Sequence, residues 1–503
     1  MQIHLIALSL LIFLSSRVFG KFNFIIFLTD DQDLILNSLE PLKNIEKFVT
    51  SKGVIFKNAF TTSPICCPSR SGILTGLYAH NTRTFNNSVE GGCYSNEWIE
   101  KHERRTFPAI LHENGYKTFY AGKYLNDYYS KNIPYGYDDF YGLHGNSKYY
   151  NYTLTENGKV VKYGDMPEDY LTNVIKNQAK DFITNQSKDE PFLAIISTPS
   201  CHAPFTPEEK YKDALSNYTV PRSDNFNVGA KATEKHWLLT MKPKKLSETV
   251  ISKIEHYYRS RLQTLLSVDD MVGDIINQLE KQSLIDNTYI IFTSDNGYHL
   301  GNWAMPWDKR LPYETDIKIP LIIRGPNVPQ KHVIDFPIAL IDLAPTVLSL
   351  AGISYNLSQF DGEPFDKLID INNFDSERMF ERQILIEHYG EGTRDTFNPE
   401  CPYRKSQRLF GCSIDADCKC QDSWNNTYAC VRHLASDIDF IYCTFNDHVS
   451  FNEAYYLTAD PYQMNNVAYD LLPSVQALYQ LTAEDLKNCQ GDSCRVIRPI
   501  YPF

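Results

Sequence analysis

The sequence has no excess of positive charge and only one long apolar run. It carries 49 Lys and Arg residues against 61 Asp and Glu residues, a formal net charge of -12 at pH 7. Such an acidic chain does not favour binding to nucleic acid or to an anionic membrane. Beyond residue 20, the best candidate for a bilayer span is residues 336–352, which Asp342 and two prolines interrupt. We therefore expect no span there, and the absence of repeats and low-complexity tracts leaves a large globular chain.

The one apolar run lies at the N-terminus. Residues 5–14 are apolar apart from Ser9, and Val18 and Gly20 stand where a signal peptidase reads the chain. We interpret residues 1–20 as a signal peptide. An uncleaved anchor is the alternative, because the segment before the apolar run carries only His4 and the amino terminus. Six predicted N-glycosylation sequons agree with the secretory pathway: Asn86, Asn151, Asn185, Asn217, Asn356 and Asn425.

Strand and helix patterns alternate in the first 370 residues. Short apolar runs typical of buried strands occupy residues 22–30, 117–123, 191–199, 287–295 and 319–326, and a helical pattern covers 257–282. This alternation predicts an α/β fold, with a parallel or mixed sheet flanked by helices. The charged segment 366–383 is poor in core residues, so we predict a larger domain over residues 21–370 and a smaller one over 371–503.

The cysteines divide into two groups. Eight of the 12 lie after residue 400 in a polar, loop-rich region, which predicts a disulfide framework. A zinc site in residues 412–420 is the weaker alternative, because histidine partners are missing there. The other four are Cys66, Cys67, Cys93 and Cys201. Adjacent cysteines rarely pair with each other; if Cys66 is chemically altered, one pair remains possible, which we expect to be Cys67 with Cys93, leaving Cys201 free.

Polar side chains follow four of the predicted strands. In open α/β sheets, ligands bind just beyond the carboxyl ends of the strands. Three carboxylates and one amide oxygen are hard ligands that suit Ca²⁺ or Mg²⁺ better than zinc. Each Asp pair taken alone could be a turn or a helix cap, but together they favour a metal site. The strand ends carry Asp30, Asp31, Lys123, His202, Asp295 and Asn296.

A short motif gives the most specific signal. Residues 64–70, Pro-Ile-Cys-Cys-Pro-Ser-Arg, are followed by Ile-Leu-Thr-Gly at 73–76. This pattern resembles the signature of the type I sulfatases, in which the cysteine of a Cys-x-Pro-x-Arg core is oxidised to formylglycine in the endoplasmic reticulum. Longer stretches, including "AGKYLNDY", "NTYIIFTSDNGYHLG" and "LTADPYQMNN", resemble the glucosamine (N-acetyl)-6-sulfatase branch. The similarity runs from about residue 21 to the C-terminus.

The resemblance implies a fold and a nucleophile. The fold would be the alkaline-phosphatase-like sulfatase fold, with a smaller disulfide-rich α+β domain at the C-terminus. Cys66, converted to formylglycine (3-oxoalanine), would carry two hydroxyls when hydrated: one attacks sulfur, and the other later loses its proton to expel sulfate. A divalent cation, Ca²⁺ or alternatively Mg²⁺, would bind a sulfate oxygen and acidify the attacking hydroxyl. Its implied ligands are Asp30, Asp31, Cys66, Asp295 and Asn296.

The resemblance also implies roles for basic residues. Arg70 matches the arginine that fixes the formylglycine, and Lys123 and Lys309 match the lysines that clamp the sulfate group. Arg310, beside Lys309, is the alternative group for reaching the site. His202 resembles the histidine that contacts the sulfate and protonates the departing sugar oxygen.

One position departs from the pattern of many sulfatases. They place a histidine shortly after the first lysine, whereas this chain has Asn126, which cannot act as a base. We expect Asn126 to bind the sulfate or the hydrated aldehyde, and His299 or His80 to handle the proton. Residues 144–152 and parts of the cysteine-rich tail are expected to contribute to sugar specificity.

The expected activity is hydrolysis of 6-O-sulfate esters of N-acetylglucosamine at the non-reducing end of heparan or keratan sulfate fragments. An extracellular heparan 6-O-endosulfatase is the alternative, but those enzymes carry a long basic insertion that this chain lacks. An inactive glycan-binding relative is another, with Cys66 left as a thiol. The resemblance implies lysosomal residence, with secretion as the alternative. Its implied partners are a sulfated glycosaminoglycan oligosaccharide, the formylglycine-generating enzyme, a mannose-6-phosphate receptor and a second copy in a homodimer.

Overall fold

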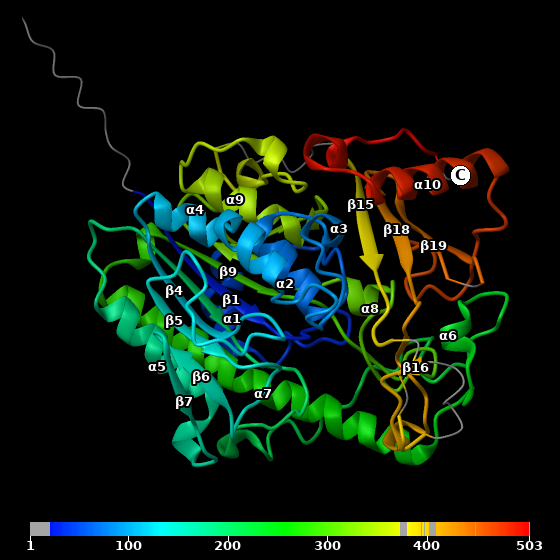
Figure 1. Cartoon of the computed structure of the whole chain (residues 1–503), viewed down its shortest axis with the longest axis horizontal. Helices are drawn as coiled ribbons and strands as arrows, with labels where there is room; N and C mark the ends of the chain where they lie inside the picture. Colours follow the sequence, from blue (N-terminus) through cyan, green and yellow to red (C-terminus); the bar gives the residue numbers. More distant parts are fainter. Residues whose placement is uncertain are drawn as a thin grey trace, which may run out of the picture.

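The computed structural model of the protein describes residues 21–372, 380–393, 395–396, 398–401, 409–447 and 449–501. The predicted signal peptide and part of the predicted boundary segment 366–383 lie outside these residues. The chain forms a large mixed sheet covered by helices and a smaller antiparallel sheet near the C-terminus (Figure 1). The expected α/β class, with a disulfide-rich C-terminal region, is confirmed. Within the described residues, no helix is long and apolar enough to cross a membrane.

The large sheet has ten strands. β1 pairs in parallel with β8 and β9, and β4 pairs in parallel with β8 and β5, whereas β12 runs antiparallel to β9. In spatial order the strands are β13 (His332–Ile334), β2 (Val54–Phe56), β12 (Leu321–Arg324), β9 (Thr288–Ser294), β1 (Asn23–Thr29), β8 (Phe192–Ser197), β4 (Lys117–Lys123), β5 (Asp139–Leu143), β6 (Thr153–Glu156) and β7 (Lys159–Lys162). The five predicted strand segments therefore contain β1, β4, β8, β9 and β12.

Both faces of the central strands β1, β8 and β9 are buried, which explains the continuous apolar runs of these strands. Alternate residues of β1 point to opposite faces: Ile25 and Phe27 pack in one core, and Phe24 and Ile26 in the other. The first core contains residues of α1 (Lys43–Phe48), α5 (Leu171–Thr184) and α7 (Glu248–Lys281). The second contains residues of α2 (Cys66–Thr75), α4 (Phe107–Glu113) and α9 (Leu343–Leu350).

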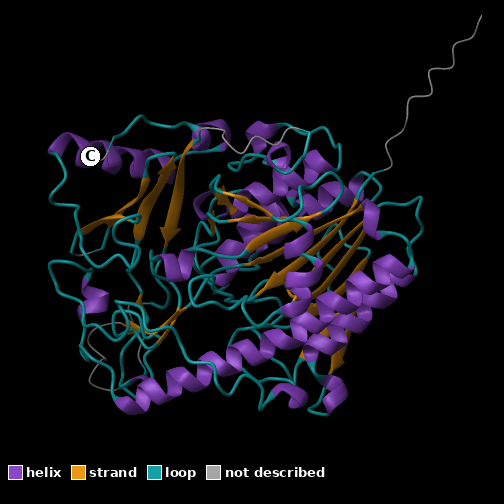
Figure 2. Ribbon diagram, turned by 180° about the vertical axis from the view of Figure 1, so that it is seen from behind, coloured by secondary structure: helices purple, strands orange, loops and turns teal. Residues whose placement is uncertain are grey.

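Helix α7 has 34 residues and begins nine residues before the predicted helical segment. Its start is fixed by Ser247, whose side chain accepts a hydrogen bond from the Val250 N–H and so caps the helix. The buried positions recur at helical spacing and face the sheet. Figure 2 shows α7 extending beyond the large sheet, and its first residues lie near Asp417, which accepts a hydrogen bond from the Ser247 N–H.

The smaller sheet is antiparallel, in the order β15 (Glu381–His388), β18 (Tyr428–Ala435), β19 (Asp439–Phe445) and β20 (Asn452–Tyr456). Helix α10 (Pro473–Lys487) packs on it through Tyr479, which stacks on Tyr442. The remaining short elements are β3 (Ala59–Phe60) with β14 (Ile338–Ala339), β10 (His299–Leu300) with β11 (Trp307–Asp308), β16 (Leu409–Phe410) with β17 (Asp422–Ser423), α3 (Ala79–Thr82), α6 (Trp237–Thr240) and α8 (Glu314–Ile317).

Disulfides tie the C-terminal region together, as predicted. All eight cysteines after residue 400 are paired, in the bridges Cys401–Cys418, Cys412–Cys420, Cys430–Cys443 and Cys489–Cys494. These bridges use every cysteine of residues 412–420 and so exclude the zinc alternative. The domain boundary near residue 370 stays a prediction, because side chains from both parts share one hydrophobic cluster.

Candidate functional site

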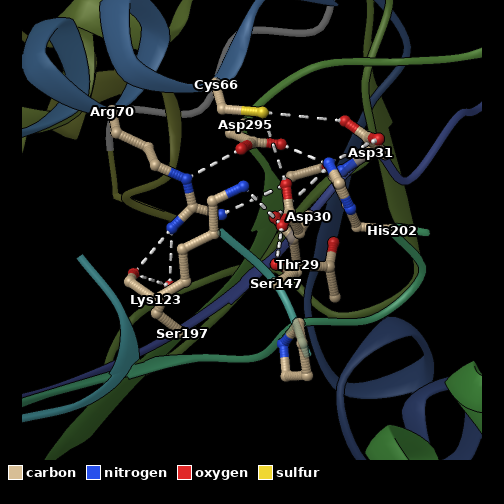
Figure 3. Close-up of polar contacts among 12 residues, drawn as sticks. Thr29, Asp30, Asp31, Cys66, Arg70, Lys123, Ser147, Ser197, His202 and Asp295 are labelled. Atoms are coloured by element: carbon tan, nitrogen blue, oxygen red, sulfur yellow. Dashed lines mark hydrogen bonds and ion pairs between the residues drawn. The ribbon is translucent and has the colours of Figure 1, made fainter. Parts of the chain in front are cut away.

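The carboxyl ends of the central parallel strands converge on one cluster of polar side chains (Figure 3). Thr29 of β1 pairs with Ser294 of β9, so the residues that follow them are neighbours. The Asp31 N–H donates to Asp295 Oδ1 at 3.0 Å, and the Asn296 side-chain amide donates to Asp31 Oδ1 at 2.8 Å. The side chains predicted to meet at this edge therefore lie in contact.

Cys66 stands at the first position of helix α2, facing this cluster. Its Sγ lies 3.7 Å from Asp30 Oδ1 and 4.0 Å from Asp31 Oδ1. Every residue of α2 is buried, and Gly76 closes the helix with a positive φ of 70°. Burial raises the pKa of the Cys66 thiol to about 12, although nearby lysines oppose the rise. An unmodified Cys66 would therefore be a neutral thiol and a weak nucleophile at physiological pH.

The neighbouring Cys67 points away into a disulfide with Cys93. Cys201 is free and buried, like Cys66. The expected pairing is therefore confirmed, and the cysteine doublet is divided between a structural bridge and a thiol at the strand ends.

Two lysines neutralise the paired aspartates. Lys123 Nζ donates to Asp30 Oδ2 and Lys309 Nζ donates to Asp31 Oδ2, both at 2.7 Å. Burial alone would raise the pKa of Asp30, but Lys123 and the other nearby cations outweigh it and hold that pKa well below its usual range. Burial opposes Lys309 in the same way at Asp31, whose pKa is also lowered. Both carboxylates are therefore ionised.

Arg70, one helical turn after Cys66, lies beneath the cluster with 1% of its surface exposed. Its Nε donates to Asp295 Oδ2 at 2.8 Å, and its Nη1 donates to the Lys123 carbonyl oxygen at 2.8 Å and to Ser197 Oγ at 2.7 Å. One guanidinium thus ties α2 to the ends of β4, β8 and β9. Burial raises the pKa of Asp295 to about 6, against the lowering effect of Arg70.

His202 presents one ring nitrogen to the cluster. Its Nδ1 lies 2.6 Å from the Ala203 carbonyl oxygen, which can only accept, so Nδ1 carries the proton. Its Nε2 lies 3.8 Å from Asp31 Oδ2. Burial, followed by the charge on Lys309, lowers the pKa of His202. The ring is therefore a neutral group whose Nε2 can accept a proton.

Comparison with known proteins identifies the family. The sequence profile described as Sulfatase matches residues 23–353, about two thirds of the chain. The chain belongs to the sulfatase family. It is 42% identical over 492 residues to the N-acetylglucosamine-6-sulfatase of Homo sapiens, covering 96% of this chain and 88% of the human protein. The corresponding protein of Capra hircus is also 42% identical, over 488 residues that cover 95% of this chain and 86% of the goat protein.

Solved structures share the fold at lower identity. One, described as a complex with its substrate D-glucosamine-2-N,6-O-disulfate, superposes with a TM-score of 0.72 at 22% identity. The match covers 93% of this chain and 98% of the other. Membership of the family makes this chain a sulfuric ester hydrolase.

The cluster of polar side chains at the strand ends has the ligand types of a cation site. Ligand atoms of Asp30, Asp31, Cys66 and His202 all lie within 4.8 Å of one another. The side-chain oxygen of Asn296 is buried and has no hydrogen-bond partner among the described residues, so it is an acceptor available to a cation. Carboxylate and amide oxygens fit a hard divalent ion. His202 belongs to this group of ligand atoms but was not in the expected ligand set. Asp295 was in that set, but its Oδ2 accepts a hydrogen bond from Arg70.

A pocket of about 500 Å³ opens beside the cluster, lined in part by Asp31, His202 and Lys309. One wall is aromatic, and Tyr257 packs against Trp307 with ring centroids 5.0 Å apart. The other lining residues include Phe205, Tyr298, Asn87, Asn146, Ser413 and Asp415. Both segments that were expected to contribute to sugar specificity line this pocket, residues 144–152 through Asn146 and the cysteine-rich tail through Ser413 and Asp415.

Two residues of the cluster were not among the predicted site residues, although Ser147 lies in the segment 144–152 that was expected to contribute to sugar specificity. Ser147 donates a hydrogen bond to Asp30 Oδ2 from a loop that follows β5. Asn87 accepts a hydrogen bond from the Cys67 N–H at 2.9 Å and lines the pocket. Neither stands at a strand end or in the motif, so only the folded chain brings them to the site.

The remaining predicted residues, which were expected to bind the sulfate, to handle the proton or to replace Lys309, lie around the cluster rather than in it. Asn126 donates to Asn146 at 3.3 Å, and its own side-chain oxygen has no hydrogen-bond partner in the described part of the chain. His299 Nδ1 lies 3.0 Å from Asp316 Oδ1. His80 has both ring nitrogens occupied, by Glu387 and by the Cys489 carbonyl. The alternative to Lys309, Arg310, directs its Nε to Glu391 at 2.5 Å.

Proposed function

We propose that this sulfatase hydrolyses 6-O-sulfate esters of N-acetylglucosamine residues at the non-reducing ends of heparan or keratan sulfate fragments. The observation that carries the proposal is the 42% identity to human N-acetylglucosamine-6-sulfatase across 96% of this chain. A terminal sugar fits the architecture, because the pocket combines an aromatic wall with amide side chains. Sugar rings bind such surfaces through their apolar face and their hydroxyl groups.

The nucleophile in this proposal is Cys66 after its oxidation to formylglycine. Its position at the start of a ten-residue helix places it where the helix dipole favours negative charge. The neutral, buried thiol of the unmodified residue argues against direct thiolate attack. Arg70 would hold the modified side chain by fixing α2 against the strand ends, a role supported by its three short hydrogen bonds.

Lys123 and Lys309 would stabilise the negative charge that develops on the sulfate oxygens. Each already lies 2.7 Å from a carboxylate beside Cys66, so both cations point at the reacting centre. Asp30, Asp31, Asp295 and Asn296 would hold Ca²⁺, or alternatively Mg²⁺. When bound, the ion supplies Lewis-acid polarisation of a sulfate oxygen and acidifies the attacking hydroxyl.

His202 would first accept, at the Nε2 that faces the cluster, the proton that the attacking hydroxyl loses, and would then pass this proton to the departing sugar oxygen. Asn126 would donate from its amide to a sulfate oxygen, or accept at its unpartnered oxygen from a hydroxyl of the hydrated aldehyde. His299 would handle the proton during sulfate release, since its Nε2 has no hydrogen-bond partner within the described residues and is free to exchange one.

Mass spectrometry of the Cys66 peptide tests the nucleophile. Conversion of the thiol-bearing side chain to an aldehyde lowers the residue mass by about 18 Da. We expect this loss in protein from a competent eukaryotic host, and no turnover in Cys66→Ala. An unmodified Cys66 in active protein would contradict the proposal, and an unmodified Cys66 in inactive protein would favour a glycan-binding relative.

Substrate competition tests the specificity. Sulfate release from N-acetylglucosamine-6-sulfate should exceed release from sulfated galactose, iduronate and aryl esters at acidic pH. Equal rates on all of them would reject the sugar assignment. Efficient release from the interior of intact heparan chains would instead favour an endosulfatase. Asp30→Ala should lower activity and metal retention together, and normal metal content in this variant would argue against the ligand role.

We further propose a lysosomal location reached through the secretory pathway. The partners that we propose with it are the formylglycine-generating enzyme, a mannose-6-phosphate receptor and a second copy of the chain in a homodimer. All six sequon asparagines are at least partly exposed, which supports N-glycosylation. Residues 21–370 would form the catalytic domain and residues 371–503 the smaller C-terminal one.

A further inference from the structure

The backbone on both sides of Lys309 adopts unusual conformations. Asp308 has a φ of 135° and Arg310 a φ of 91°. Residues other than glycine rarely adopt such φ angles, and these backbone conformations persist only where the surrounding structure holds them in place. Lys309 therefore projects from a segment whose shape depends on its contacts.

The contacts of the Arg310 backbone reach in two directions. Its N–H donates to the Pro64 carbonyl oxygen at 3.1 Å, two residues before Cys66. Its carbonyl oxygen accepts a hydrogen bond at 2.9 Å from the hydroxyl of Tyr428, at the start of β18 in the smaller sheet. One peptide segment thus joins the approach to helix α2 with the C-terminal region.

The Arg310 side chain adds an ion-pair network. Its Nε donates to Glu391 Oε2 at 2.5 Å, and its Nη1 lies 2.6 Å from Asp308 Oδ1. Asp422 lies 4.0 Å from the same Nε and accepts a hydrogen bond from the Glu391 N–H. The arginine side chain is 8% exposed, so its charge is satisfied mainly by residues of the chain.

We propose that Arg310 is a positioning residue through which the C-terminal region holds Lys309 against Asp31. Lysine has a long, flexible stem, so the place of its ammonium group depends on how firmly its backbone is held. Arg310 fixes that backbone from one side through Glu391 and Tyr428. This inference rests on the proposed role of Lys309 in sulfate binding.

The first experiment compares Arg310→Ala and Arg310→Lys with a matched control. Arg382 is another buried arginine, in the C-terminal region itself, and it pairs with Asp342 of the larger region at 2.6 and 2.8 Å. A displacement of about 1 Å at a catalytic group can cost about 100-fold in rate. We expect kcat to fall about 100-fold in Arg310→Ala, less in Arg310→Lys, and less than about twofold in Arg382→Ala, with KM nearly constant throughout.

A double-mutant cycle with Lys309→Ala separates positioning from general destabilisation. If Arg310 acts through Lys309, removing Arg310 should change kcat less than about twofold once Lys309 is absent. Its effect on the melting temperature should persist in that background. Equal losses of kcat with and without Lys309 would overturn the inference.

Arg310 also lines the pocket, so direct contact with the sugar is the competing role. A raised KM with unchanged kcat in Arg310→Ala would assign it that role and reject positioning. All rates are measured on N-acetylglucosamine-6-sulfate and on a small aryl sulfate, and are normalised to formylglycine content. A wild type that cleaves only the aryl sulfate would refute the sugar assignment, while the cycle on the aryl ester would still decide the role of Arg310.

Discussion

His102 and Glu103 are neighbours whose shifted pKa values make the free energy of unfolding depend on pH. Glu103 is 6% exposed, its Oε2 accepts a hydrogen bond from the Tyr135 N–H at 3.3 Å, and its Oε1 has no hydrogen-bond partner among the residues described. Burial raises the pKa of Glu103 to about 7, from a usual value near 4.5. The folded protein therefore holds this proton to a higher pH than the unfolded chain does.

The sign follows from proton linkage. Between pH 4.5 and 7 the folded state binds more protons at Glu103 than the unfolded state, so stability falls as pH rises through this window. A shift of about 2.5 pKa units corresponds to about 3 kcal/mol, which is fully lost above pH 7. For a chain of 503 residues, an unfolding entropy of about 1 kcal/mol/K makes this roughly 3 °C in melting temperature.

His102 opposes this effect. Burial, with a further contribution from Arg105, lowers the pKa of His102 to about 4. Its stabilising contribution is lost as pH falls from 6.5 towards 4, because the unfolded chain takes up the proton first. The two neighbours therefore compensate in mildly acidic solution.

Replacing Glu103 by Gln removes only one of the two effects. We expect the variant to be more stable than wild type at pH 7.5 by roughly 3 °C, and similar to it at pH 4.5. The difference in melting temperature between the two proteins should therefore shrink as the pH falls from 7.5 to 4.5. Melting curves from pH 4.5 to 8 measure this, with Glu113→Gln as an exposed control. A variant that melts in parallel with wild type at every pH would refute the reasoning.

Three further changes test the site and its support. Gly122→Ala should lower the melting temperature strongly, because Gly122 has a φ of 106° and an added Cβ would come within 1.7 Å of a carbonyl oxygen on β8. Gly115→Ala is the control for the backbone cost alone, because Gly115 has a φ of 85° and its added Cβ would meet nothing within 4 Å. Equal melting temperatures of the two variants would contradict the predicted clash. Ser147→Ala removes a hydrogen bond to Asp30 and should lower kcat about tenfold at nearly constant melting temperature, so unaltered kinetics would exclude a role in the site. Replacing Cys67 and Cys93 together by Ser opens a 26-residue loop and should lower the free energy of unfolding by about 3.5 kcal/mol. A free energy of unfolding close to that of the wild type in a denaturant titration would contradict a stabilising role of this disulfide.

Sequence patterns predicted the elements that depend on local composition. The segment 117–123 coincides with β4 because its apolar run is bounded on both sides by charge. The aspartates after β1 and β9 were predicted to meet because parallel neighbours end at one edge, and this argument needs no knowledge of loops. The cysteine doublet was interpretable because its motif is specific.

The loops around the site could not be predicted in this way. Ser147 reaches Asp30 across 117 positions in the chain, and no periodicity marks it. Arg310 was considered only as a substitute for Lys309, whereas its guanidinium lies beside Glu391, on a distant part of the chain. Contacts of this kind arise from tertiary packing, which hydrophobic patterns do not encode.

The burial of Cys66 has a consequence for the order of events during biosynthesis. Its side chain is completely enclosed, and the adjacent disulfide to Cys93 closes the chain around it. If Cys66 is oxidised to formylglycine as proposed, the oxidising enzyme would have to reach its side chain before α2 docks. Folding and the proposed oxidation would then compete in time, and the active fraction of a preparation would record which of the two came first.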